Sequence, residues 1–226
     1  MGNDVVTLEG VRKQYFRKGR DEARHFDAVA GVDLVLHEGE LVELVGRSGS
    51  GKSTLLNMAA GLVAPTEGTV AFKGQNLYSL DDAALSKLRN ESFGVIPQGQ
   101  TALHDLTVIE NVKLAYLMYR ADDGVDNRAM ELLAKLGIEQ LAECYPSELS
   151  GGEMRRMAIA RALICKPAVI YADEPTGDLD DENTKVVLDV LREAADDGAA
   201  VLVVTHEQAA ADYADRIIRM DAGKLV

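Results

Sequence analysis

The sequence predicts an α/β fold with a mostly parallel sheet, an antiparallel region near the start and an inserted helical region. Two observations lead to this class. The loop GRSGSGKST, at residues 46–54, joins the apolar run ELVELVG to STLLNMAAGL, whose apolar residues recur at helical spacing. After residue 165, the runs AVIYAD and AVLVVTH have the composition of buried strands, and the helical pattern TKVVLDVLREAADDG separates them. Strands that alternate with helices imply a parallel sheet.

The elements before and between these runs follow from local patterns. VVTLEGVRKQYF and HFDAVAGVDLVLHEGELVELVG alternate apolar and polar residues around Gly31 and Gly39, which predicts antiparallel strands. APTEGTVAFKGQNL predicts a further strand and turn, and SLDDAALSKLRNES, at 79–92, predicts a helix with an acidic start. From about residue 107 to 165 the pattern is mostly helical. We therefore expect one domain over 1–226, with a helical subdomain at 97–166.

Composition narrows the functional classes. The 226 residues are 47% hydrophobic, enough for a substantial core, and the net charge of -13 disfavours a broad nucleic-acid-binding surface. Cys144 and Cys165 lack the spacing of a zinc site or a disulfide framework. No stretch approaches the ~18 apolar residues of a membrane span, and MGNDVVTLEG lacks the layout of a signal peptide. We expect a soluble, cytoplasmic chain.

The glycine-rich loop matches G-x-x-x-x-G-K-[ST], the pattern of a phosphate-binding P-loop. Glycines let backbone N–H groups surround an anion, and the start of the following helix adds partial positive charge. Lys52 is expected to reach the terminal phosphates, and Ser53 to offer its hydroxyl to Mg²⁺. A flexible linker is the alternative, but it would not lie between a strand and a helix. The residues expected to bind a nucleoside triphosphate here are Gly46, Arg47, Ser48, Gly49, Ser50, Gly51, Lys52, Ser53 and Thr54.

A second acidic motif ends the apolar run AVIYADEP. Buried carboxylates require a cation or a catalytic role, because desolvated charge is costly. Beside a P-loop, Asp173 is expected to hold Mg²⁺, and Glu174 is expected to polarise the attacking water. An acidic pair that faces solvent is the alternative.

The motif LSGGE, at 149–153, precedes another helical run. Ser150, Gly151 and Gly152 would place N–H groups at a helix start, where they form a second anion site. A helix cap with Glu153 in the first turn is the alternative. Two adjacent glycines are unnecessary for a cap, however, and they suit a backbone that approaches phosphate.

Four motifs in this order, GRSGSGKS, LSGGE, YADEPTGDLD and VTHE, resemble the ATP-binding subunit of ABC transporters over essentially the whole chain. The resemblance implies a P-loop NTPase fold with a RecA-like core and hydrolysis of ATP with Mg²⁺. It also implies that two chains form a homodimer on binding ATP, so that the LSGGE signature of each closes on the ATP of the other, with Glu153 standing where glutamine is commoner. The segments RKGRDEARHFDAVAGVDL and YPSELSGGE look like the lipoprotein-releasing and macrolide-exporting branch (LolD and MacB types).

The resemblance assigns further roles near the nucleotide. Gln98, in GVIPQG, looks like the Q-loop glutamine that contacts Mg²⁺ and water, although Pro97 before it departs from the family pattern; a solvated loop residue is the alternative. His206 is similar to the switch histidine that contacts the γ-phosphate, with a structural histidine as the alternative. Tyr15 resembles the aromatic residue that stacks on adenine, with Phe16 as its rival.

Other roles concern partners. Asp178 and Asp180, in GDLD, resemble a loop that contacts the second subunit; an acidic turn and helix start is the alternative. The resemblance further implies a separate membrane permease, a peripheral position on the cytoplasmic face of the membrane, and no direct contact with the transported substrate. Apolar side chains of 97–166 are expected to form a groove for the permease, at Leu103, Leu106, Val108 and Met118.

The sequence thus predicts an ATPase subunit that powers a permease for export or for extrusion of lipoproteins, peptides or drugs. Two other functions are considered. A non-transport ABC ATPase that acts on DNA or ribosomes would normally show two fused cassettes or a coiled-coil insertion, and this sequence shows neither. An ATP-binding scaffold of the cell-division type, with slow turnover, carries the same residue types, so the sequence does not separate it from a transport ATPase.

Overall fold

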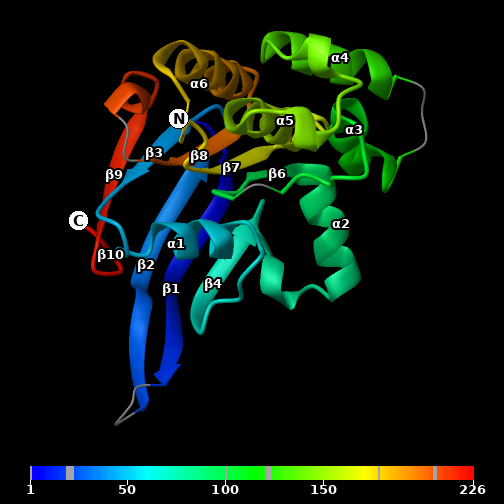
Figure 1. Cartoon of the computed structure of the whole chain (residues 1–226). Coiled ribbons are helices and arrows are strands. Elements are labelled where there is room, and N and C mark those ends of the chain that lie inside the picture. The colour runs from blue at the N-terminus through cyan, green and yellow to red at the C-terminus, as the bar shows by residue number, and fades with distance from the viewer. Residues whose placement is uncertain (1, 19–22, 100, 121–123, 178, 206–207) are drawn as a thin grey trace.

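The computed structural model describes residues 2–18, 23–99, 101–120, 124–177, 179–205 and 208–226 (Figure 1). These residues form two sheets, one of six strands in the order β10-β9-β3-β8-β7-β6 and one of four in the order β2-β1-β4-β5. The strands of the larger sheet are β3 (Leu41–Val45), β6 (Phe93–Ile96), β7 (Val169–Asp173), β8 (Ala200–Val204), β9 (Arg216–Asp221) and β10 (Lys224–Leu225). Those of the smaller sheet are β1 (Asp4–Lys18), β2 (Ala23–His37), β4 (Glu67–Phe72) and β5 (Gln75–Asn76).

The larger sheet is parallel except at its β10 edge, as the sequence predicts. β8 lies at its centre between β3 and β7, and Val204 at the end of β8 is in register with Leu44 of β3 and Asp173 of β7. The carboxyl ends of these three strands therefore meet at one edge. In open α/β sheets that edge is where ligands bind.

The smaller sheet is antiparallel, and β1 and β2 form its long hairpin (Figure 1). The prediction was wrong for β3, which was grouped with the antiparallel strands: it pairs in parallel with β8 and β9. The turn at Gly39, with φ of 75°, separates β3 from β2. Four of the five β3 residues are buried, as expected for a strand covered on both faces.

Three strands were missed by sequence reasoning. β6 has only four residues, and its Gly94 weakens the strand pattern. A Cβ on Gly94 would lie 2.6 Å from the carbonyl oxygen of Ala162, so the glycine allows a helix to approach the strand closely. β9 and β10 follow the last motif; burial alternates along β9, but its sequence RIIRMD does not alternate apolar and polar residues.

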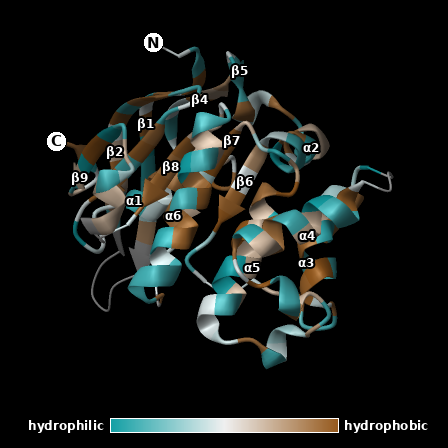
Figure 2. Cartoon of the chain, turned by 90° about the horizontal axis from the view of Figure 1, so that it is seen from above, coloured by the Kyte–Doolittle hydropathy of each residue, from teal (hydrophilic) through white to brown (hydrophobic). Residues whose placement is uncertain are grey.

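The helices cover both faces of the larger sheet, and the buried side chains form two clusters (Figures 1 and 2). Val42, Leu44 and Leu202 face the smaller sheet, whereas Leu41 and Val201 face the other way. This alternation is the period of two expected of strands. The helices are α1 (Lys52–Ala59), α2 (Asp82–Ser92), α3 (Val108–Leu117), α4 (Val125–Lys135), α5 (Gly151–Leu163) and α6 (Asp181–Asp196).

α1 packs between the two sheets, and α3, α4 and α5 lie together between β6 and β7 in the chain. The helix expected at 79–92 begins at Asp82, because Asp81 caps it by accepting a hydrogen bond from the N–H of Ala84. Val108 is fully buried at the start of α3, so its expected place in a docking groove is wrong. Its side chain packs in the cluster of buried residues that includes Val112 and Ile96, and its N–H donates to the carbonyl of Cys144. Within the described ranges, no helix is long and apolar enough to cross a membrane.

Candidate nucleotide site

The glycine-rich loop joins β3 to α1, and neighbouring backbone atoms leave no room for side chains at two of its glycines. Gly51 caps α1 with φ of 107°, a left-handed conformation that favours glycine. A Cβ on Gly51 would lie 2.0 Å from the carbonyl oxygen of Ala28 in β2, and one on Gly46 would lie 2.3 Å from that of Met220 in β9. The loop therefore passes so close to the backbones of β2 and β9 that only glycine fits at Gly46 and Gly51.

Lys52, the first residue of α1, folds back over this loop. Its Nζ donates to the carbonyl oxygens of Gly46 at 2.7 Å and Arg47 at 3.1 Å. The hydroxyl of Ser50 lies buried beneath, with no hydrogen-bond partner among the described residues. Because the ammonium group occupies the rim of the loop, it is placed to meet an anion held there.

Asp173, at the end of β7, supplies a buried carboxylate close to the loop. It is 7% exposed, and burial raises its pKa above the ordinary value of 3.8; the nearby hydroxyl of Ser53 opposes this rise. Its Oδ1 has no hydrogen-bond partner in the described part of the chain. A buried oxygen without a partner, beside a serine hydroxyl, is the hard oxygen set that Mg²⁺ prefers. These residues therefore fit a magnesium ion.

Glu174 has a constrained backbone. Its φ is 51°, in the left-handed region that few non-glycine residues occupy, and its N–H donates to the carbonyl of Val204 at 2.7 Å. Strained backbone of this kind concentrates at functional sites, where the surrounding structure fixes it. The bond to β8 anchors Glu174 at the edge of the sheet where the P-loop begins.

A cavity of about 630 Å³ brings these groups together. The predicted residues that line it are Tyr15, Gly46, Ser48, Gly49, Gly51, Lys52, Ser53, Thr54, Gln98, Asp173 and Glu174. The lining also contains four residues that the sequence analysis missed: Phe26, Asp27, Ala28 and Val204. The side chain of Gln98 is exposed, at the end of β6. Asp178 and His206 lie outside the described residues.

One wall of the cavity is aromatic. Tyr15 of β1 and Phe26 of β2 are cross-strand partners whose ring centroids lie 6.0 Å apart, and they are 37% and 48% exposed. Phe16, the rival of Tyr15, does not line the cavity and packs against His25 instead. Consecutive strand residues point to opposite faces, which separates the two candidates. Phe26 is recognisable only through its pairing with Tyr15, a long-range contact.

The aromatic wall gives a direct test. We expect Tyr15→Ala and Phe26→Ala each to weaken ATP binding by about 1–3 kcal/mol, the contribution of a ring stacked on a base. Phe16→Ala is the matched control and should leave the affinity unchanged. Fluorescence titration with a labelled ATP analogue measures all three. A larger loss in the Phe16 variant than in the other two would contradict this assignment.

Comparison with known proteins decides the family. The profile of the ABC transporter family matches residues 29–177. The chain belongs to this family. It is 39% identical over 223 residues to the lipoprotein-releasing system ATP-binding protein LolD of Myxococcus xanthus, covering 98% of both chains. The LolD of Pseudomonas syringae pv. tomato is 44% identical over 200 residues, covering 88% of both.

Solved structures of ABC cassettes agree with this family assignment. A dimeric structure of the ATP-binding cassette MJ0796 in a post-hydrolysis state, bound to ADP and Pi, matches with a TM-score of 0.90 and 37% identity over 97% of this chain and 96% of that one. A second dimeric structure of MJ0796, described as a bacterial ABC transporter cassette, has a TM-score of 0.90 and 38% identity over the same shares. The chain therefore has the α/β P-loop NTPase fold and is an ATP-hydrolysing subunit of an ABC transporter.

The ABC signature LSGGE lies at the start of α5. Ser150 caps α5 in a capping box: Glu153 accepts hydrogen bonds from the N–H and the hydroxyl of Ser150, both at 2.7 Å. The hydrogen bonds from Ser150 hold the pKa of Glu153 below its ordinary value. The cap considered as an alternative is therefore present. None of the signature residues Ser150, Gly151, Gly152 and Glu153, nor Arg47 and Ser50 of the P-loop, lines the cavity of the same chain.

Asp180 also has a structural role. It caps α6, where its Oδ1 accepts hydrogen bonds from the backbone and side-chain nitrogens of Asn183, both at 2.8 Å. The acidic helix start that was the alternative for GDLD is thus present at Asp180. Its side chain is exposed, which leaves its second oxygen accessible from outside the chain.

Proposed function

We propose that this chain is the ATPase subunit of a lipoprotein-releasing (LolD-type) ABC transporter and works at the cytoplasmic face of the membrane. The observation that carries the proposal is the identity of 39% and 44% to two proteins named LolD, over 98% and 88% of this chain. The nucleotide cavity supports the ATPase part of the proposal, because the P-loop and the carboxylates of Asp173 and Glu174 converge there.

In this proposal the chain's own groups divide the work of hydrolysis. The P-loop amides and Lys52 would bind the triphosphate, and Ser53, Asp173 and Gln98 would hold Mg²⁺. The ion, when bound, neutralises charge on the phosphates. Glu174 orients and deprotonates the attacking water as the general base. His206 contacts the γ-phosphate as a further catalytic residue, as the family resemblance implies.

We also propose that a second copy of the chain completes the site. Ser150, Gly151 and Gly152, at the start of α5, would bind the γ-phosphate held in the partner's cavity, and Glu153 and Asp178 would lie nearby. The absence of the signature residues from their own cavity supports this arrangement. So does the dimeric state of the MJ0796 structures. The dimer would close on ATP and reopen after hydrolysis, and this cycle would drive the permease.

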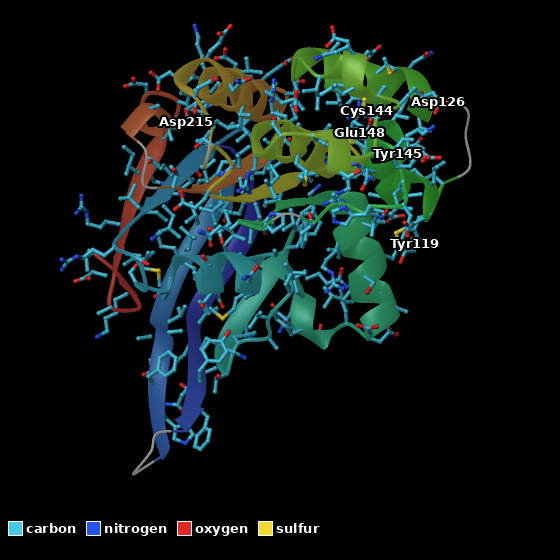
Figure 3. All side chains as sticks on the ribbon, viewed as in Figure 1. Tyr119, Asp126, Cys144, Tyr145, Glu148 and Asp215 are labelled. Carbon is cyan, nitrogen blue, oxygen red and sulfur yellow. The ribbon has the colours of Figure 1, made fainter. Side chains whose placement is uncertain are left out.

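The helical region offers a surface for the permease. Large apolar side chains are exposed on α3 and its flanks, at Leu103, Leu117, Met118 and Tyr119, and on the lead-in to α5, at Tyr145. Figure 3 shows Tyr119 and Tyr145 in the helical region, on the opposite side of the molecule from Asp215 beside β9. Of the groove residues expected from sequence, Leu103 and Met118 are exposed and Leu106 is half-buried. We assign this exposed set to the permease, and the transported substrate to the permease alone.

Purification of the tagged chain from the membranes of its native cells tests the proposal. After gentle solubilisation we expect to recover an integral membrane protein with few spans and a large extracytoplasmic domain. The variant Leu103→Glu/Met118→Glu should lose that partner but keep its ATP affinity. A matched variant far from the helical region, Ile217→Glu on β9, should keep both. Recovery of soluble proteins only would contradict the transport function and favour the scaffold alternative.

A further inference from the structure

The segment that joins β6 to α3, residues 97–107, is held at its backbone by side chains of other elements. Arg155 of α5 donates from Nη1 to the carbonyl of Pro97 and from Nη2 to that of Gln98, both at 2.8 Å. A guanidinium group presents its donors in a fixed planar fork, so two bonds to consecutive carbonyls define both position and orientation. Gln98 therefore takes its backbone placement from the signature helix.

Two further side chains hold the rest of the segment. Arg161, also on α5, donates to the carbonyl of Thr101 at 2.8 Å and to its hydroxyl, and burial lowers the pKa of this arginine. Asn111 of α3 is fully buried and donates to the carbonyls of Leu103, Leu106 and Thr107, each at 3.0 Å. The end of the segment is thus fixed to α3, and its beginning is fixed to α5.

Gln98 lies where two cavities meet. It lines the nucleotide cavity of about 630 Å³ and also a second cavity of about 230 Å³, whose walls include Gly151, Arg155 and Gly177. The second cavity thus lies between the start of α5, the Gln98 segment and the turn after Glu174. A shift of α5 would change the width of the second cavity. It would also move Gln98, because Arg155 bonds the backbone of Gln98 to α5.

We propose that Arg155 is a positioning residue for hydrolysis: it fixes Gln98 in the nucleotide cavity and couples it to the signature residues at the start of α5. Arg155 follows Gly151 by four residues, about one helical turn, so the two move as one rigid unit. Contact of Gly151 with the partner's nucleotide would then adjust Gln98 in the same chain. The inference rests on the proposed role of Gln98 at Mg²⁺ and water.

The test is a double-mutant cycle in the whole 226-residue chain. Arg155→Met should lower kcat for ATP hydrolysis by about tenfold or more, because a displacement of about 1 Å in a positioning group costs up to about 100-fold. The KM for ATP should change by less than about twofold, since the P-loop is untouched. Gln98→Ala should have a similar effect, and the double variant should be no slower than Gln98→Ala alone.

Arg128→Met is the matched control. Arg128 on α4 is also half-buried and donates to two backbone carbonyls, those of Ile164 at 2.7 Å and Leu163 at 2.9 Å. Its loss should destabilise the chain as much as that of Arg155 but leave kcat unchanged. If Arg155→Met folds poorly, Arg155→Lys is the second variant to measure. Lysine keeps the charge and can bond one carbonyl at a time, so this variant should keep part of the wild-type kcat.

If Arg155→Met keeps full kcat while Gln98→Ala loses it, the positioning role is overturned and the role of Gln98 stands. If the two losses multiply in the double variant, Arg155 acts by another route, which also overturns the proposal. If Gln98→Ala keeps full kcat, the proposed role of Gln98 fails first and the inference fails with it.

Discussion

Replacement of Glu174 by glutamine is expected to lower steady-state ATP turnover by about 100-fold or more, the contribution typical of a general base. Glutamine has the same shape, so the left-handed backbone at φ of 51° and the bond to Val204 should persist. ATP binding should therefore survive, and the variant should accumulate as an ATP-bound dimer. Phosphate release measures turnover, and gel filtration with light scattering measures the dimer.

Glu131→Gln is the control for this experiment. Glu131 is exposed on α4 and does not line the nucleotide cavity, so its variant should keep wild-type turnover and should not accumulate as a dimer. If Glu174→Gln behaves like Glu131→Gln in both measurements, Glu174 is not the general base.

The second large effect is expected from Gly51→Ala. A Cβ at this position would lie 2.0 Å from the carbonyl oxygen of Ala28, so the P-loop or β2 must shift. The left-handed conformation itself costs a non-glycine residue about 1–2 kcal/mol. We expect the Kd for ATP to rise above about 1 mM and the free energy of unfolding to fall by more than this strain alone. Isothermal titration calorimetry and urea unfolding measure the two quantities.

Gly74→Ala separates the clash from the strain. Gly74 lies in the turn between β4 and β5 with φ of 80°, and a Cβ there would meet nothing within 4 Å. This variant should lose about 1–2 kcal/mol of stability and keep its ATP affinity. Equal stability of the two variants, together with unchanged ATP binding in Gly51→Ala, would show that the close approach to Ala28 does not constrain the loop.

Local patterns were sufficient to predict much of the fold and the site. The strand before the P-loop, the helix after it and the acidic end of β7 each follow from a short contiguous run. Their convergence is predictable too, because parallel strands bring their carboxyl ends to one edge of the sheet. Lys52, Ser53, Asp173 and Glu174 accordingly lie around one cavity.

The errors arise where contacts are long-range. Phe26 lies in the site because β2 pairs it with Tyr15 of β1, a contact that the local sequence does not show. Val108 belongs to the core because it packs in a buried cluster with residues far along the chain, such as Met157 and Leu133. β6 was missed because Gly94, which weakens the strand pattern, is present for the close packing of α5. A single sequence contains these residues but not the neighbours that explain them.

In the proposed dimer one chain supplies the P-loop and a second supplies the signature, so hydrolysis requires two copies. The most direct measurement is the ATPase activity per chain of the purified protein over a wide range of chain concentrations. We predict that this specific activity rises with concentration and reaches a plateau as dimers form on ATP. A specific activity that stays constant down to concentrations at which the chain is monomeric would contradict the account, because a single chain would then hydrolyse ATP alone.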